Sequence, residues 1–191
     1  MPTKIILIRH GETVLSLKKA YYGITDTRLT ANGKKQAKSL TAKLQREKVQ
    51  KVYSSDLRRA FDFAKIIFKD YPIEKNSQLR ELNFGILEKM TYEQIMKKCP
   101  ELYSSWIKKP FDTCIPKGEH LRDFKNRVLD CFNNILRANT DKITAIVSHA
   151  GPIRIILNEI LKPKDIWSIE VNLASINVIT FCRGGPCVRP K

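Results

Sequence analysis

The chain has 191 residues, of which 42% are hydrophobic and 28% charged, so it is long enough to bury a sizeable core and too apolar for a disordered protein. Lysine and arginine number 35 against 19 aspartates and glutamates, a net charge of +16. This surplus attracts anions in general, but it does not distinguish nucleic acids, acidic membranes and phosphorylated metabolites.

Neither secretion nor a membrane partner is expected from the sequence. No run approaches the ~18 consecutive apolar residues of a membrane span, and the N-terminal apolar run ends at Ile8, followed by Arg9 and His10 instead of a cleavage site. The five cysteines are odd in number and form no C-x-x-C pair, which is typical of reduced thiols. We therefore expect a cytoplasmic protein in which Cys182 and Cys187 are free, although oxidation could join them in a small loop.

Two strand and helix units open the chain. Residues 4–8 predict a strand buried on both faces, and a helix with lysines on its outer side follows from about 30 to 48. Residues 49–53 predict a second strand. The apolar stripe over 57–68 predicts a second helix, which ends before Pro72.

The segment from about 84 to 118 breaks this alternation. Its short helical patches are interrupted by Pro100, Pro110 and Pro116, which indicates an insertion that covers another part of the protein. A long amphipathic helix is then predicted from about 119 to 138.

Three further elements complete the chain. Residues 143–147 predict a strand, and residues 153–161 predict a helix with Pro152 as its first residue. Residues 176–181 predict a last strand before a turn at Gly184-Gly185-Pro186.

This alternation predicts one domain, residues 1–191, with an α/β fold. It is a three-layer α/β/α sandwich with a mostly parallel sheet and a small helical covering insertion over about 84–118. In such folds ligands bind outside the carboxyl ends of the strands. Three strand ends therefore matter, and they carry Arg9-His10, the turn over 54–59, and His149.

Two of the three histidines, His10 and His149, directly follow strands that are typical of a buried sheet. A loop histidine that bonds a backbone carbonyl is the ordinary alternative for either one, but the pairing favours a shared site. Arg9 and Arg59 are either solvated surface arginines or forks for phosphate oxygens. A zinc or iron site would need a third ligand at suitable spacing, so we expect an anionic substrate, no metal and no cofactor.

Further sequence blocks extend this pattern along nearly the whole chain. They are Arg9-His10-Gly11-Glu12-Thr13, then Tyr22 to Ala37, Ser54 to Ala60, Leu79 to Gly85, and Pro116 to Val128 followed by Val147 to Arg154. In this order the blocks resemble the histidine phosphatases of the phosphoglycerate mutase superfamily.

The resemblance implies a chemical role for each central residue. His10 would attack phosphorus as a neutral imidazole and form a phosphohistidine, while Arg9, Arg59 and His149 neutralise the phosphate oxygens. Glu81 would donate a proton to the leaving alcohol and later accept one from water. Its ordinary alternative is a surface glutamate beside Arg80.

The resemblance also implies further contacts. Ser16, Gly11 and Ala150 would contact the phosphate, and Tyr22, Gly23, Arg80 and His120 would contact the rest of the substrate.

Three positions depart from the family's usual pattern. Ser16 stands where Asn is common, Lys89 where Gly is usual, and His120 where Ser is usual. His120 is either an exposed residue at a helix start or a neutral imidazole that meets the non-phosphate part of the substrate.

The reaction expected from the resemblance is hydrolysis. Mutases of the family carry a longer covering insertion and C-terminal tail, whereas here Glu81 and His149 are 68 residues apart and the chain ends soon after Phe181. The chain resembles the compact phosphatases, and among them the α-ribazole-5'-phosphate phosphatases of cobalamin synthesis. A phosphoglycerate mutase, or a phosphatase of sugar phosphates or phosphoserine, is the alternative.

A basic nucleic-acid-binding protein is the alternative from another class. Lys34, Lys35 and Lys38 lie along one predicted helix, but no interleaved aromatic residues or nucleic-acid motif accompany them. The expected partner is a small phosphorylated substrate, with no specific nucleic acid and no membrane. Both a monomer and a homodimer are compatible with the sequence.

Overall fold

The computed structural model describes residues 2–182 and 185–190, with side chains as far as residue 181, so the pairing of Cys182 and Cys187 lies outside the described residues. A six-stranded sheet has the order β3-β2-β4-β1-β5-β6. The first four of these strands run parallel, whereas β5 is antiparallel to both β1 and β6. The strands are β1 (Thr3–Arg9), β2 (Lys51–Ser54), β3 (Ile73–Lys75), β4 (Ile143–Ser148), β5 (Ile176–Cys182) and β6 (Gly185–Pro190).

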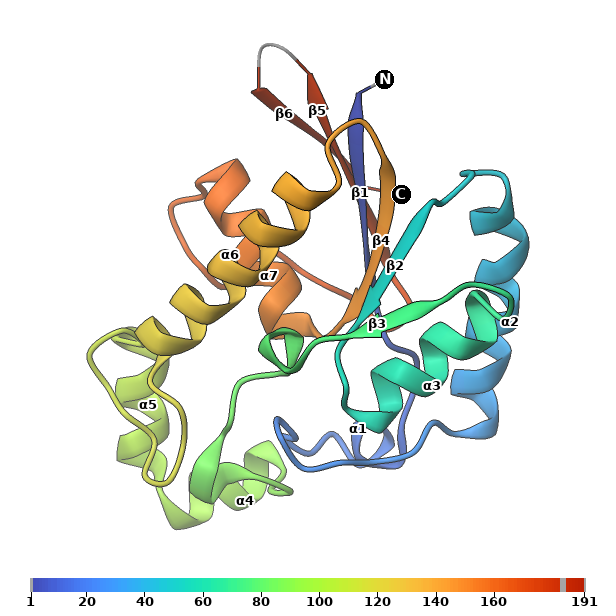
Figure 1. Ribbon diagram of the computed structural model, residues 1–191. Coiled ribbons are helices and arrows are strands. Elements are labelled where there is room, and N and C mark those ends of the chain that lie inside the picture. The colour runs from blue at the N-terminus through green and yellow to red at the C-terminus, as the bar shows by residue number, and fades with distance from the viewer. Residues whose placement is uncertain (1, 183–184, 191) are drawn as a thin grey trace.

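Helices cover both faces of this sheet, with α2 and α3 on one side and α6 and α7 on the other (Figure 1). The expected three-layer α/β/α fold is confirmed. The described helices are α1 (Val14–Leu17), α2 (Ala31–Gln45), α3 (Arg58–Ile67), α4 (Tyr92–Lys98), α5 (Pro100–Lys108), α6 (Leu121–Ala138) and α7 (Ala150–Leu161), with 3-10 turns at Ser77–Leu79 and Gly85–Leu87. Over the described residues, every helix is too short or too polar to cross a bilayer.

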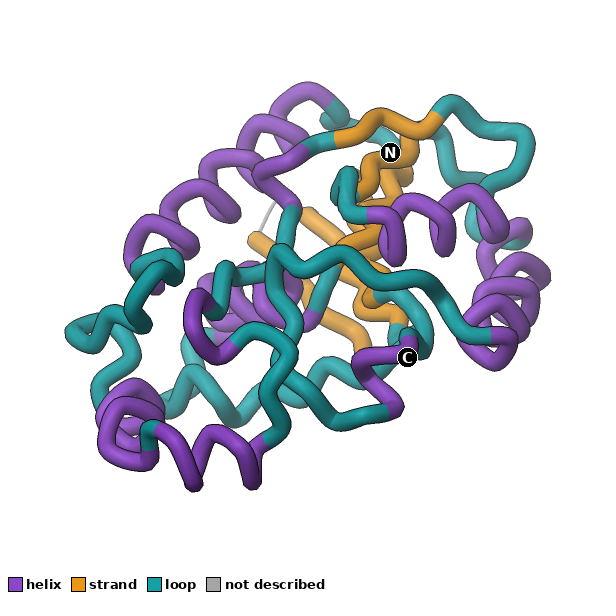
Figure 2. Tube along the Cα trace, turned by 90° about the horizontal axis from the view of Figure 1, so that it is seen from below, coloured by secondary structure: helices purple, strands orange, loops and turns teal. Residues whose placement is uncertain are grey.

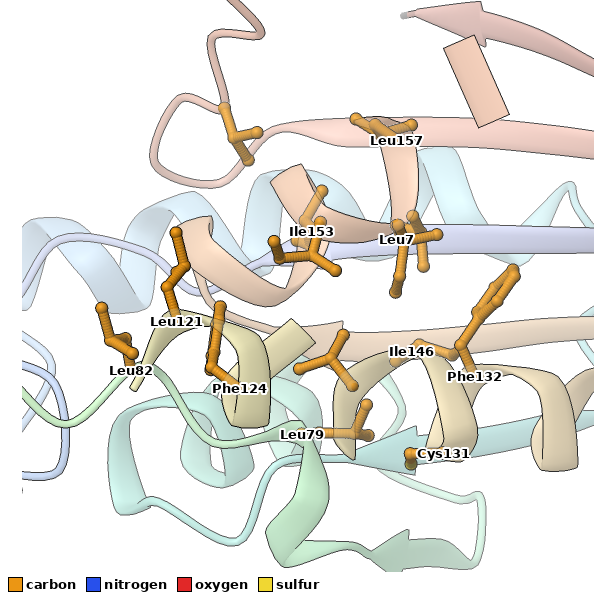
Figure 3. Packing of buried hydrophobic residues seen from close by; sticks show 14 of the residues in the cluster. Leu7, Leu79, Leu82, Leu121, Phe124, Cys131, Phe132, Ile146, Ile153 and Leu157 are labelled. Atoms are coloured by element: carbon orange, nitrogen blue, oxygen red, sulfur yellow. The ribbon is translucent and has the colours of Figure 1, made fainter. Parts of the chain in front are cut away.

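The central strand β1 has no solvated face. Its alternate residues Ile5 and Leu7 pack into one apolar cluster, and Ile6 and Ile8 pack into a second on the opposite side of the sheet. All four side chains are completely buried. Figure 3 shows Leu7 in the first cluster, facing the side chains of α6 and α7. Burial on both faces explains why this strand is continuously apolar instead of alternating.

The structure corrects three details of the expected element order. The short edge strand β3 is mostly exposed and lacks an apolar pattern, so the sequence did not indicate it. The strand β5 is not the last one, because β6 follows it and pairs with it. Helix α7 begins at Ala150, so Pro152 is its third residue, where a missing N–H costs no hydrogen bond within the helix.

The covering segment carries α4 and α5 and lies beyond the lower end of the sheet in Figure 1, the end that Figure 2 shows from below. It is fastened to the loop after α1. A bridge joins Ala20 to Thr91, and the hydroxyl groups of Tyr21 and Tyr103 lie 2.6 Å apart. The segment therefore forms a wall over the carboxyl ends of the parallel strands.

Candidate active site

A cavity of about 210 Å³ lies between these strand ends and the covering segment. Arg9 and His10 reach it from the end of β1, and Ala150 and Gly151 reach it from the first turn of α7. Glu81 follows the turn at Ser77–Leu79 and also lines it. The fold thus brings together residues that are far apart in the sequence.

His10 is a neutral imidazole with one nitrogen free. Its ring is 2% exposed, and Nδ1 lies 2.8 Å from the carbonyl oxygen of Gly11. Because a carbonyl only accepts hydrogen bonds, Nδ1 carries the proton and Nε2 keeps its lone pair. Burial holds the pKa of His10 well below its usual 6.5, and the nearby charges of Arg59 and Arg9 lower it further.

His149 is fully buried against His10, with the two ring centroids 5.1 Å apart. Nε of Arg59 donates to Nδ1 of His149 over 3.2 Å, which places the proton of His149 on Nε2, 2.8 Å from Oγ of Ser55. Burial and then the charge of Arg59 hold the pKa of His149 well below 6.5. A phosphate oxygen would have to replace Ser55 as the acceptor if His149 is to contact phosphate.

Arg59 is a fully buried cation held by backbone oxygens. Its terminal nitrogens donate to the carbonyls of Gly23 at 2.6 Å and Thr25 at 3.0 Å. The N–H groups of the same loop, at Gly23 and Thr25, donate to the carboxylate of Glu88. Burial lowers the pKa of Arg59, and one N–H on each terminal nitrogen is not used by these bonds.

Two buried polar atoms at the cavity have no partner within the described residues. They are Nε of Arg9 and the hydroxyl of Tyr22. The rest of the Arg9 guanidinium is anchored, because Nη1 donates to the carbonyl of Val171 over 2.6 Å. A buried donor without an acceptor is costly, so the two atoms indicate a place where a ligand supplies acceptors.

The carboxylate of Glu81 is fixed by two backbone N–H groups. Leu82 donates to Oε1 at 2.9 Å and Gly151 donates to Oε2 at 3.0 Å. A Cβ atom at Gly151 would lie 2.0 Å from Oε1, so glycine is needed for this approach. Glu81 is thereby presented to the cavity in a single orientation.

The outer part of the cavity is mainly aromatic. The ring centroids of Trp106, in the covering segment, and Trp167 lie 5.2 Å apart. The guanidinium of Arg154 lies over the ring of Trp167, 5.7 Å from its centroid. Glu81 is the one acidic residue of the lining, against the three cations Arg9, Lys19 and Arg154. The other lining residues are Ala20, Tyr21, Tyr22, Leu82, Phe84, Leu121, Phe124, Ile155 and Ile166.

Arg59 and His149 are completely buried and do not line this cavity themselves, although His149 packs against His10, which does. The side chains of three other predicted contacts are engaged elsewhere. The hydroxyl of Ser16 completes the capping box of α1 by accepting from the N–H of Thr13 at 2.8 Å, and Ser16 lines a neighbouring hollow instead. Arg80 is paired with Asp56, at 2.5 Å. The side chain of His120 caps α6 by accepting from the N–H of Arg122 at 3.2 Å. Their roles toward a substrate stay predictions.

Gly11 and Gly23 contribute to the site through their backbone carbonyls and because neither position has room for a side chain. A Cβ atom on Gly11 would lie 2.6 Å from the ring of Phe63, and one on Gly23 would lie 1.6 Å from the carbonyl oxygen of Leu82. The carbonyls of both glycines hold side chains of the site, His10 and Arg59 respectively.

Sequence reasoning did not place four further side chains at the cavity. These are Lys19, Trp106, Arg154 and Trp167. The only available signal was composition, because Trp106 and Trp167 are the two tryptophans of the chain. Nothing in their spacing shows that they meet.

The donor set of the site suits an anion and not a metal ion. The described residues contain no group of three His, Cys, Asp or Glu side chains that could hold a metal. The cavity is lined instead by the guanidinium groups of Arg9 and Arg154, which are donors that suit phosphate or carboxylate oxygens.

Comparison with known protein families gives one match over most of the chain. The family model described as the histidine phosphatase superfamily (branch 1) matches residues 5–189.

The relatives include phosphatases with two different substrates in their names. Phosphoserine phosphatase 1 of Hydrogenobacter thermophilus is 32% identical over 180 residues, covering 92% of this chain and 85% of the relative. A metal-independent phosphoserine phosphatase of Arabidopsis thaliana is 31% identical over 182 residues, covering 93% and 76%. The crystal structure of the α-ribazole phosphatase from Shigella flexneri matches with a TM-score of 0.87 at 27% identity, covering 98% and 95% of the two chains.

Proposed function

The chain belongs to the histidine phosphatase superfamily and is a phosphoric monoester hydrolase, and we propose that it acts without a metal through a phosphohistidine on His10. The substrate is a small phosphorylated metabolite with a ring-bearing alcohol, of which α-ribazole 5'-phosphate is our candidate. The cytoplasmic location, the link to cobalamin synthesis and the oligomeric state stay predictions from the sequence.

The first half of the reaction transfers the phosphoryl group to the protein. The lone pair of His10 Nε2 forms the new bond to phosphorus while the bond between phosphorus and the alcohol oxygen breaks. Arg9 and Arg59 balance the charge that spreads over the three remaining phosphate oxygens. Protonated Glu81 donates its proton to the departing alkoxide, so the alcohol leaves neutral.

The second half returns the enzyme to its starting state. Water attacks phosphorus, the bond to Nε2 of His10 breaks, and the carboxylate of Glu81 accepts a proton from the water. Inorganic phosphate leaves, and His10 is again a neutral imidazole with its proton on Nδ1. Glu81 is protonated and ready for the next substrate.

The observation that carries the proposal is that one cavity is lined both by His10, whose Nε2 keeps its lone pair, and by Arg9, whose Nε has no partner within the described residues. A buried nucleophile next to an unsatisfied cationic donor is suited to a phosphate, because the phosphate supplies both the electrophile and the missing acceptor.

The lining of the cavity favours a ring over an amino acid in the leaving group. Phosphoserine carries an ammonium group, and Glu81, which is reserved for proton transfer, is the one acidic residue of the lining. The aromatic rings of Trp106 and Trp167 can instead pack against a flat base such as that of α-ribazole.

The test is a comparison of kcat/KM among α-ribazole 5'-phosphate, L-phosphoserine, 3-phosphoglycerate and p-nitrophenyl phosphate. We expect α-ribazole 5'-phosphate to be preferred over phosphoserine, and Trp167→Leu to reduce that preference. The matched control is Tyr71→Leu, because Tyr71 is exposed and does not line the cavity. Equal or better hydrolysis of phosphoserine by the native enzyme contradicts the substrate proposal but not the phosphatase proposal.

A phosphoserine phosphatase is the second candidate, favoured by the identity to the relatives that carry this name. In that case Arg154 and Lys19 would bind the serine carboxylate. Mutase activity is the third possibility. Phosphorus NMR of the reaction with 3-phosphoglycerate detects it, because isomerisation would produce 2-phosphoglycerate.

A further inference from the structure

We infer that Arg127 and Glu119 form a clamp that positions the general acid Glu81, an inference that rests on the function proposed above. Arg127 lies on α6 and Glu119 in the loop before it, and neither lines the cavity. Both are therefore positioning residues and do not touch the substrate.

The guanidinium of Arg127 binds three carbonyl groups of the segment that ends in Glu81. Nη1 donates to the carbonyl of Gln78 at 2.7 Å and to that of Arg80 at 3.0 Å. Nη2 donates to the carbonyl of Glu81 itself at 3.2 Å. One side chain thus holds two carbonyls just before the catalytic residue and the carbonyl of that residue itself.

The carbonyl of Leu79, which Arg127 does not bind, accepts a hydrogen bond from a residue of the sheet. Oγ of Ser148, at the end of β4, donates to the carbonyl of Leu79 over 2.8 Å. The four consecutive carbonyls from Gln78 to Glu81 are therefore all fixed by side chains. Bonds to four consecutive carbonyls restrict the movement of this backbone segment. They indicate that the position of Glu81 is tightly restricted.

Glu119 holds Arg127 in place. Oε1 of Glu119 accepts from Nε of Arg127 at 2.5 Å, and Oε2 accepts from Nη2 at 2.9 Å. Both side chains are about 20% exposed, so the bidentate pair is largely shielded from water. The N–H of Glu119 also donates to the carbonyl of Asn83 at 2.9 Å, which ties the chain on the other side of Glu81.

Only arginine can do this work at position 127. Five N–H groups in one plane are needed to reach three carbonyls and a carboxylate, whereas a lysine ammonium has three donors in another geometry. A loosened clamp would let the Glu81 carboxyl move relative to the leaving oxygen. A displacement of about 1 Å can lower a rate by about 10²-fold.

A loss of general-acid catalysis can be distinguished from a general loss of structure, because only the loss of general-acid catalysis depends on the acidity of the alcohol that leaves. Ethyl, phenyl and p-nitrophenyl phosphate release alcohols of increasing acidity, so the need for a donated proton falls along the series. The ratio kcat/KM reports only the steps up to phosphohistidine formation. It therefore isolates the step in which Glu81 acts as an acid.

The experiment measures kcat/KM for this series with Arg127→Gln, Arg127→Lys and Glu119→Gln, using Glu81→Gln as the reference. We expect each clamp variant to lose about 10²-fold with ethyl phosphate and much less with p-nitrophenyl phosphate, as Glu81→Gln does. The double variant Arg127→Lys/Glu81→Gln should be no slower than Glu81→Gln alone. Arg122→Gln is the matched control, because Arg122 lies on the same helix with an ion pair to Asp112 and a bond to the carbonyl of Phe111.

The outcomes separate this inference from the proposed function. If Glu81→Gln shows the leaving-group dependence and the clamp variants lose activity equally with all three substrates, the clamp is merely structural and the inference is overturned. If Glu81→Gln shows no such dependence, the acid role of Glu81 fails, and the inference fails with it. Arg122→Gln should match the native enzyme with every substrate, and a loss like that of Arg127→Gln would also contradict a specific clamp.

Discussion

Nε of Arg59 donates a hydrogen bond to Nδ1 of His149 over 3.2 Å, between two side chains that are both fully buried. This bond uses the lone pair of Nδ1 and so requires a neutral His149, whereas His10 donates from Nδ1 to the carbonyl of Gly11 and its pKa is lowered by burial and by the charges of Arg59 and Arg9. The two histidines of the site therefore bring no positive charge. The charge that a bound phosphate needs comes from the arginines.

Loss of Arg59 should be severe. Arg59→Ala removes a cation from the phosphoryl-transfer site and the partner of His149, and a transition-state arginine can be worth ~10³ to 10⁵ in rate. We expect a fall of this order in kcat with p-nitrophenyl phosphate. The neighbouring Arg58 is exposed and paired with Asp62, so Arg58→Ala is the control and should retain activity. A mild effect of Arg59→Ala together with a large effect of Arg58→Ala would reverse the assignment.

Stability should fall as the pH drops below 6.5. Burial lowers the pKa of His10 and of His149 in the folded state, so between the lowered values and 6.5 the unfolded chain binds more protons than the folded one. The free energy of unfolding then decreases with falling pH, by about 1.4 kcal/mol per pH unit for each histidine at its steepest. Above pH 6.5 the contribution of both groups is constant.

Urea denaturation at pH 7.5, 6.5, 6.0 and 5.5 measures this slope. In His10→Asn the slope should shrink by the share of one histidine, whatever the variant does to stability at neutral pH. A native protein whose unfolding free energy is flat over this range would show that the two imidazoles are not held neutral.

The sequence predicted the fold and the centre of the site for the same reason. Residues 4–8 are apolar without alternation, which is typical of a strand covered on both faces, and polar residues follow at its carboxyl end. The topology of a parallel sheet then brings His10 and His149 to one edge. The histidine phosphatase resemblance is confirmed by the family match over residues 5–189.

The rest of the site depends on contacts that no periodicity indicates. Trp106 and Trp167 meet because the covering segment folds over the loop after α7, and short helices broken by prolines leave that geometry open. Ser16 and His120, whose contacts with a substrate stay predictions, show a local role that the sequence analysis did not assign to them. Both lie at helix starts, where side chains that accept from backbone N–H groups are favoured, and their polar atoms are used as caps.

Metal chelation should leave the activity intact. In the proposed mechanism Arg9 and Arg59 balance the charge of the transferring phosphoryl group, so that role would need no divalent cation. We expect unchanged kcat after dialysis against excess EDTA. Activity that disappears on chelation and returns with Mg²⁺ or Mn²⁺ would contradict the mechanism, and a magnesium-dependent phosphatase treated in parallel shows that chelation was complete.

Substitution of His120 should affect stability more than substrate choice. Its Nδ1 accepts from the N–H of Arg122 at the start of α6, so His120→Ala removes the cap and should cost about 1 kcal/mol of unfolding free energy. His120→Ser retains a capping oxygen and should be near neutral. A change in KM among substrates with different leaving groups, at unchanged stability, would instead place His120 at the substrate.

The most direct test of the account is to trap the phosphoryl group on His10. Native protein mixed with a phosphorus-32-labelled substrate and quenched within milliseconds should carry label that is lost in acid and stable in base, as a phosphohistidine is. Mass spectrometry of the labelled peptide should place it on His10, and His10→Ala should show neither label nor turnover. Turnover by His10→Ala at more than a trace, or label on any other residue, would contradict the account.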